Sequence, residues 1–153
     1  MKSTKFIVKT KSKSYPIYFG NNIINTTGKL IKKGLPNVNK ICIISDKKIP
    51  RLFLKRLIRS LKKYDLKIYK LSVNEKTKSF KVAYKIIEQL LKNNFNRSDC
   101  VIAFGGGVLG DLSAFIANLT KRGLKFINIP TTLLAQVDAS IGGKTGINSN
   151  QGK

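Results

Sequence analysis

Apolar residues follow two different spacings along this chain, and the change of spacing separates predicted strands from predicted helices. The predicted strands of the main body cover residues 40–45, 66–73, 100–104 and 125–129. The predicted helices cover residues 23–33, 50–63, 77–94 and the stretch from the glycines at 105–107 to about residue 119. The runs at 40–45 and 100–104 are almost wholly apolar, which is typical of strands buried on both faces.

Strand and helix alternate from residue 40 onward, which predicts an α/β fold with a mostly parallel sheet. Two shorter strands, at 6–10 and 15–19, precede this unit and predict a β-hairpin that ends at Gly20. We therefore expect one nucleotide-binding-like, Rossmann-like domain over residues 1–153 with the hairpin at its start. Such sheets bind ligands at the carboxyl ends of their strands.

Composition narrows the class of protein. The 153 residues are 42% hydrophobic and 24% charged, the balance of a globular domain rather than a disordered chain. No apolar run approaches the roughly 18 residues of a membrane helix, and the start lacks the apolar core of a secretory signal, so we expect a cytoplasmic protein. Cys42 and Cys100 lie within apolar runs and are expected to be buried free thiols. The absence of histidine excludes every histidine-dependent mechanism from these residues.

The net charge of +23 suggests a nucleic-acid partner, but its distribution argues against one. Lysine supplies most of the 30 basic residues, and the lysines are scattered rather than gathered into a stripe. Arginine, which is preferred for base edges and bidentate phosphate contacts, is scarce. Solvated surface lysines explain the charge better, and a basic nucleotide- or RNA-binding module remains the alternative.

A glycine-rich loop follows the strand at 100–104. Residues 105–110, Gly-Gly-Gly-Val-Leu-Gly, fit the pattern G-x-G-x-x-G between a strand and a helix. Glycines let backbone amides approach a phosphate, and the helix N-terminus favours negative charge. The loop does not follow the first strand, and no acidic residue lies near position 130, so it predicts a phosphate or pyrophosphate loop, with a tight packing turn as the alternative.

A second glycine pair, Gly142-Gly143-Lys144-Thr145, resembles the end of a P-loop. The full motif requires glycine at position 138, where this chain has Asp138, and no strand directly precedes it. The sequence therefore does not predict an ATPase.

Asp111 and Asp138 are the carboxylates of residues 100–153. Asp111 follows the glycine loop and is either a helix N-terminal charge or an acceptor for a ligand hydroxyl. Asp138 is either a solvated turn residue or, with Arg122, Lys144 and Lys153, part of a site for a hydroxylated anionic substrate.

The stretches that carry these residues closely resemble the 3-dehydroquinate synthase family. They are residues 105–112, 121–123, 129–138 and 142–146, then Asn148 and 152–153, with residues 74–79 resembling an upstream cofactor loop. The match is nearly unbroken over residues 100–153. The rest of the chain has a compatible order of strands and helices.

The resemblance implies an NAD-dependent and metal-dependent lyase of the shikimate pathway. Such an enzyme converts 3-deoxy-arabino-heptulosonate 7-phosphate (DAHP) to 3-dehydroquinate and phosphate by oxidation, phosphate elimination, reduction and intramolecular aldol closure. It implies a bound divalent metal, zinc or cobalt, and a homodimer when intact. Another sugar-phosphate cyclase of the same superfamily is the alternative.

The resemblance also implies roles for individual residues. The cofactor residues would be Asp46, Glu75, Lys76, Thr77, Lys78, Gly106, Gly107, Val108, Leu109, Gly110, Asp111, Thr131, Thr132, Lys144 and Lys153. Arg122, Asp138 and Lys144 would be the catalytic residues that contact the substrate.

The chain departs from the family pattern in three places. Ser149 stands where many members have His, which is a minor change. Asn74 replaces a common glycine, which is a mild change because Asn tolerates the left-handed conformation. Family members are more than twice as long, and their metal ligands, a Glu and two His, lie in a helical second domain. We therefore expect an incomplete enzyme that lacks this domain and holds no metal ligand, so that this chain alone is inactive.

Overall fold

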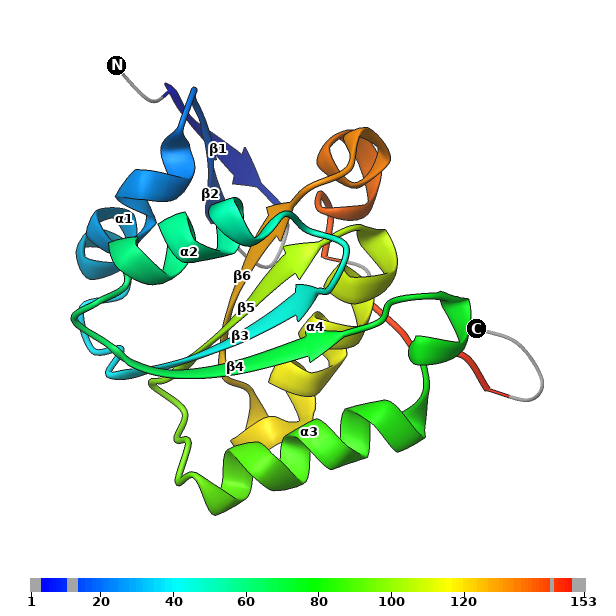
Figure 1. Cartoon of the computed structure of the whole chain (residues 1–153). Helices are drawn as coiled ribbons and strands as arrows, with labels where there is room; N and C mark the ends of the chain where they lie inside the picture. Colours follow the sequence, from blue (N-terminus) through cyan, green and yellow to red (C-terminus); the bar gives the residue numbers. More distant parts are fainter. Residues whose placement is uncertain (1–3, 11–13, 144, 150–153) are drawn as a thin grey trace.

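A four-stranded parallel sheet forms the centre of the molecule (Figure 1). The computed structural model describes residues 4–10, 14–143 and 145–149. The sheet strands are β3 (Lys40–Asp46), β4 (Asp65–Leu71), β5 (Cys100–Gly105) and β6 (Lys125–Pro130). Their order is β4-β3-β5-β6, and every neighbouring pair is parallel. The predicted parallel sheet is confirmed, and β5 is buried along its whole length.

Helices cover both faces of this sheet (Figure 1). They are α1 (Thr27–Gly34), α2 (Arg51–Ser60), α3 (Phe80–Lys92) and α4 (Gly107–Leu119). Alternate side chains of a strand point to opposite faces, so β3 contributes Ile41 and Ile43 to the core under α1 and α2, and Cys42 and Ile44 to the core under α3 and α4. The result is an α/β/α sandwich.

The helix spacing in the sequence correctly marks the buried faces. Leu54 and Leu57 of α2 are buried, as are Ile86 and Leu90 of α3. Each helix turns these residues toward the sheet because positions three or four apart share one face.

The predicted hairpin is also confirmed. Strand β1 (Thr4–Lys9) pairs antiparallel with β2 (Ser14–Phe19), and the Phe6 and Phe19 rings pack edge to face. The hairpin is a sheet of its own, and the Tyr15 hydroxyl accepts a hydrogen bond from Gly142 N (3.0 Å).

Two local features differ from the sequence predictions. The helix expected from residue 77 begins at Phe80, because a capping box between Asn74 and Thr77 first closes the short 3₁₀ turn η2 (Glu75–Thr77). A π-helical turn, η4 (Ala135–Ala139), stands where only a polar segment was expected. In the described part of the chain, no helix is both long and apolar enough to cross a membrane.

Candidate functional site

The strand order creates a crevice at the carboxyl edge of the sheet. The chain passes from β3 to β4 on one side and then returns to place β5 on the other side. The loops that follow β3 and β5 therefore diverge, and ligands of open α/β sheets bind at such a switch point.

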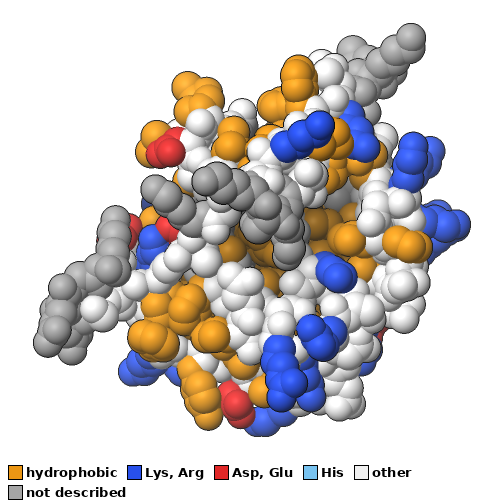
Figure 2. All heavy atoms as spheres, turned by 180° about the vertical axis from the view of Figure 1, so that it is seen from behind, with side chains coloured by type: hydrophobic (Ala, Val, Ile, Leu, Met, Phe, Trp, Pro, Cys, Tyr) orange, Lys and Arg blue, Asp and Glu red, His pale blue; other side chains and the backbone are white. Residues whose placement is uncertain are grey.

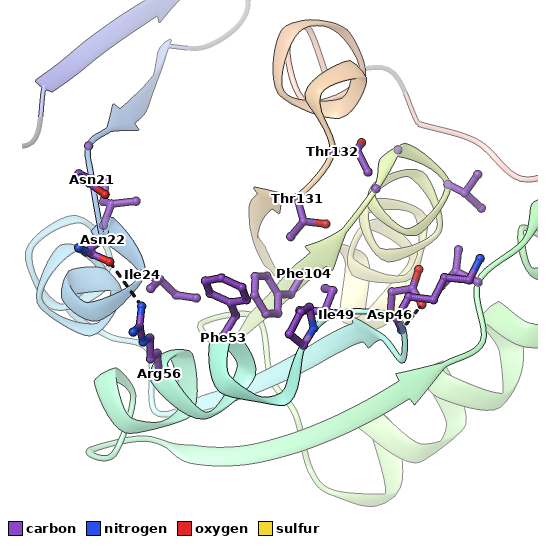
Figure 3. Close-up of a pocket in the computed structure, with 18 of the residues that line it drawn as sticks. Asn21, Asn22, Ile24, Asp46, Ile49, Phe53, Arg56, Phe104, Thr131 and Thr132 are labelled. Carbon is purple, nitrogen blue, oxygen red and sulfur yellow. Dashed lines mark hydrogen bonds between the residues drawn. The ribbon is translucent and has the colours of Figure 1, made fainter.

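A pocket of about 720 Å³ occupies this crevice (Figure 3). Its walls come from the ends of β3 and β5, from the segments that follow β4 and β6, from the turn after the hairpin, and from α2 and the start of α4. The lining residues are Gly20, Asn21, Asn22, Ile23, Ile24, Asp46, Lys48, Ile49, Pro50, Phe53, Arg56, Val73, Asn74, Phe104, Gly106, Gly107, Val108, Thr131 and Thr132. Its volume lies within the range usual for small-molecule and cofactor sites.

The glycine loop forms one wall of the pocket. Gly106 caps α4 in an extended conformation, and Gly107 is the first residue of the helix. A Cβ on Gly106 would lie 3.4 Å from Thr132 Cγ2, and a Cβ on Gly107 would lie 3.1 Å from Ala139 Cβ. The missing side chains leave the amides at the start of α4 open to the pocket, and those amides have no partner within the helix. This arrangement suits an anionic oxygen.

Asp46 and the threonines supply polar groups around that wall. The Asp46 carboxylate, at the end of β3, accepts a hydrogen bond from Lys48 N (2.9 Å). Thr131 is tied to the loop because its N–H donates to Gly105 O (2.9 Å), and Thr132 Oγ1 accepts from Ala135 N (3.2 Å). Asp46, Thr131 and Thr132 thus line the same pocket as the glycines (Figure 3).

Leu109 and Gly110 lie beneath the loop and do not line the pocket. Leu109 is fully buried, and its Cδ2 atom would lie 2.5 Å from a Cβ on Gly105. Gly110 packs against the side chain of Asn128. Both residues fix the loop against the sheet.

The upstream loop meets α4 at a partly buried ion pair. The Lys78 ammonium pairs with the Asp111 carboxylate, and only 7% of Lys78 is exposed. Asp111 therefore interacts with a neighbouring cation in this structure, an arrangement that the sequence did not indicate. Glu75 and Lys76 are exposed beside it, and Thr77 closes the capping box with Asn74.

The structure separates the residues expected to contact the substrate. Asp138 is exposed on η4, close to the start of α4. Arg122 is exposed beyond the far end of α4, which at 13 residues spans about 20 Å. The turn at residues 120–122 therefore lies at the opposite end of α4 from the glycine loop, and it leads into the start of β6 at the amino edge of the sheet (Figure 1). Lys144 and Lys153 lie outside the described residues.

The apolar side of the pocket was not predicted from the sequence. Ile24, Phe53 and Phe104 lie in a row there (Figure 3). Arg56 extends the pocket edge, where its guanidinium stacks on Phe53 and donates to Asn22 Oδ1 (3.4 Å). One signal was available in the sequence, because Phe53 is aromatic and lies off the apolar stripe of this helix; in the structure its side chain is 43% exposed.

The described part of the chain offers no grouped set of metal ligands. Among the described residues, no three His, Cys, Asp or Glu side chains are grouped to hold an ion. The cysteines do not fit the role, because burial raises the pKa of Cys42 to about 12 and a thiol must ionise to bind a metal.

Two comparisons place the fold among known proteins. The chain superposes on a structure described as 2-deoxy-scyllo-inosose synthase complexed with carbaglucose-6-phosphate, NAD+ and Co2+, with a TM-score of 0.89 and 22% identity over 98% of this chain and 41% of that one. It also superposes on ValA, a 2-epi-5-epi-valiolone synthase from Streptomyces hygroscopicus subsp. jinggangensis with NAD+ and Zn2+ bound. That match has a TM-score of 0.66 and 27% identity over 76% of this chain and 33% of that one.

Similarity in sequence shows the family of the chain as well as its fold. The chain is 47% identical to the 3-dehydroquinate synthase of Pelagibacter ubique over 149 residues, which cover 97% of this chain and 40% of that protein. It is 38% identical to the enzyme of the same name from Thermoanaerobacter sp., over 95% of this chain and 41% of that protein. The chain thus spans about 40% of the length of these relatives. Residues 68–153 match the family model described as 3-dehydroquinate synthase N-terminal, and the chain belongs to this family.

Proposed function

We propose that the crevice binds NAD and that this chain is the cofactor-binding part of a 3-dehydroquinate synthase. The observation that carries the proposal is the pair Gly106–Gly107 at the switch point between β3 and β5, where a side chain would close the approach to the first amides of α4. Family membership and the NAD in the two structural neighbours support the same ligand.

Each wall of the pocket suits one part of a dinucleotide. The amides of Gly106, Gly107 and Val108 would bind the pyrophosphate, whose charge the α4 dipole favours. The Asp46 carboxylate would accept hydrogen bonds from ribose hydroxyls, and Thr131 and Thr132 would supply hydroxyls beside the glycines. The apolar row of Ile24, Phe53 and Phe104 suits the flat face of a base.

The upstream loop would complete the cofactor site. Glu75, Lys76, Thr77 and Lys78 belong to one short turn whose last residue pairs with Asp111. Because that pair joins the loop to α4, both elements would contact the cofactor as one unit.

The intact enzyme would convert DAHP to 3-dehydroquinate and phosphate. Bound NAD would supply reversible hydride transfer at the substrate, so that it is regenerated within each turnover. Asp138 and Lys144 would hold the hydroxylated, anionic substrate beside the glycine loop, and Lys153 would contact the cofactor. The metal ligands are not among the described residues, and we derive no step through a metal.

Arg122 reaches a site at the carboxyl edge only if a second copy of the protein supplies it, because it lies at the opposite edge of its own sheet. We therefore retain its substrate role together with the expected homodimer. We also propose a cytoplasmic location, on the basis of family membership.

Another sugar-phosphate cyclase is the second candidate, since the TM-score to 2-deoxy-scyllo-inosose synthase is 0.89. Identity favours the first proposal, because it is 22% for that structure and 38–47% for the 3-dehydroquinate synthases described above.

Gly107→Val tests the glycine cradle. The valine side chain would meet Ala139 and cover the first amides of α4, so NAD affinity measured by calorimetry should fall at least about tenfold, or 1.4 kcal/mol. Gly34→Val is the matched control, because nothing lies within 4 Å of a Cβ there.

Circular dichroism should show that both variants are folded, and Gly107→Ala provides a milder change at the same position. Wild-type NAD affinity in folded Gly107→Val would remove the loop from the site. The RNA-binding alternative predicts instead an affinity for RNA that falls steeply with salt, and little affinity for NAD.

A further inference from the structure

Three segments that are distant in the sequence meet beside the glycine helix. They are the upstream loop with Glu75 and Lys78, the second turn of α4 with Asp111, and residues 145–148. Thr145 Oγ1 donates to Asp111 O (2.7 Å), while Lys78 pairs with the Asp111 carboxylate. The segment 145–148 thus contacts both residues of this partly buried ion pair, Asp111 through Thr145 and Lys78 through Asn148.

Asn148 contacts the upstream loop through both its backbone and its side chain. Its backbone N–H donates to Lys78 O (2.8 Å), and it forms an isolated parallel bridge with Ser79. Its side-chain amide donates to Glu75 Oε1 (3.0 Å) and, at 3.4 Å, to Glu75 O. Asn148 therefore contacts both Glu75 and Lys78 of the upstream loop.

The orientation of that amide follows from the chemistry of its partner. An ionised carboxylate only accepts hydrogen bonds, so the NH₂ group of Asn148 must face Glu75. This orientation leaves Asn148 Oδ1 buried without a hydrogen-bond partner among the described residues. A buried unpaired carbonyl costs free energy, and the amide keeps this orientation in spite of that cost.

We propose that Asn148 is a positioning residue that fixes the Glu75 carboxylate for cofactor binding. The inference rests on the proposed NAD site, in which Glu75 is a contact. Asn148 holds the carboxylate and the loop backbone in one arrangement before the cofactor arrives, so less conformational freedom is lost on binding. It also links the cofactor loop to the segment that directly follows Lys144, which is expected to contact the substrate.

The test is a double-mutant cycle on NAD affinity, measured by calorimetry with the folded chain. Asn148→Ala should weaken NAD binding about fivefold to tenfold, and Glu75→Ala should weaken it at least as much. In the Glu75→Ala background, Asn148→Ala should add less than about a twofold loss, because the carboxylate through which it acts is gone.

Two controls separate this role from a structural one. Asp46→Asn lies at the end of β3, away from the contact between Asn148 and the upstream loop. The loss of NAD affinity in the double variant Asp46→Asn, Asn148→Ala should therefore equal the product of the two single losses. Asn37→Ala removes an exposed asparagine in a turn and should leave NAD affinity unchanged.

The measured NAD affinities test the NAD site and the role of Asn148 separately. If the wild-type chain does not bind NAD, the proposed function fails. If the wild type and Asn148→Ala bind NAD equally well, the positioning role is overturned. It is also overturned if the loss of NAD affinity in the double variant equals the product of the two single losses. Should Asn148→Ala prove unfolded, Asn148→Ser retains a small polar side chain, and the same cycle with Glu75→Ala decides the question.

Discussion

Cys42 and Cys100 lie on neighbouring strands, β3 and β5, yet face opposite layers of the sandwich. Both thiols are free and fully buried. Burial raises the pKa of Cys42 from 9.0 to about 12, because the apolar core destabilises a thiolate. It raises the pKa of Cys100 as well, and the nearby Cys42 and Asp99 add to that shift. The sequence prediction of buried free thiols is confirmed.

We expect neither thiol to react with a disulfide reagent at about pH 8 in the folded protein, because the thiolate is the reactive form. Both should react once a denaturant unfolds the chain, and a chromogenic disulfide reagent would measure this. Rapid reaction of the native protein would contradict the burial of these side chains.

The same shift has a consequence for stability. The unfolded chain loses its thiol protons near the ordinary value of 9.0, whereas the folded chain retains them to higher pH. The contribution of Cys42 to the free energy of unfolding therefore decreases as the pH rises from about 9 toward 12. Cys42→Ala should lose less stability over this alkaline range than the wild type does.

The start of β5 is tied to its neighbours by a carboxylate that the sequence analysis did not single out. Asp99 is fully buried; its Oδ1 accepts from Lys40 N (2.9 Å) at the start of β3, and its Oδ2 accepts from Asn96 N (2.8 Å). Its carbonyl accepts from Lys125 N (2.9 Å) at the start of β6. Asp99 thus aligns three strands at the amino edge, opposite the pocket.

Asp99→Ala should lower the free energy of unfolding by about 2–3 kcal/mol, because it leaves two backbone N–H groups without their carboxylate acceptor. Asp99→Asn keeps one acceptor oxygen and should cost less. Urea unfolding measures both. Asp65→Ala, which removes an exposed carboxylate at the start of β4, should cost little, and an equal cost at both positions would contradict the role of Asp99.

Glycine spacing and apolar runs predicted the elements well, because each of these signals is local. The apolar runs at β3 and β5 predicted strands that are buried on both faces, and Gly105–Gly107 marked the turn from β5 into α4. The π-helical turn η4 has no comparable local signal, since a 5-residue turn of that kind is set by its contacts.

Charge is the dominant property of the whole molecule. The chain carries +23, and the ion pair Lys78–Asp111 joins two of its charged residues within the described ranges. On the face shown in Figure 2, Lys and Arg side chains lie across the lower middle as well as at the edge, and a group of hydrophobic side chains lies beside them. Phe80 and Tyr84 of α3 are 61% and 64% exposed, so the surface of the molecule is apolar as well as basic.

A net charge of this size destabilises the compact state by self-repulsion, and salt screens that repulsion. The melting temperature should therefore rise by several degrees between about 50 mM and 500 mM NaCl. Replacing the exposed Lys62 and Lys63 by glutamate should raise the melting temperature at low salt and flatten the salt dependence. A melting temperature that falls with salt would show that attractive charge pairs dominate instead.

The sequence alone determined the α/β class, the parallel sheet, the hairpin, the glycine loop and the family, because periodicity and motif spacing are encoded residue by residue. Only the tertiary structure decided which of these residues share a site. It brought Asp46, Gly107 and Thr132 into one pocket, added Phe53 from a helix surface, and placed Arg122 at the opposite edge. Strand order decides which of these residues meet, and it is not encoded in the local pattern of apolar and polar residues.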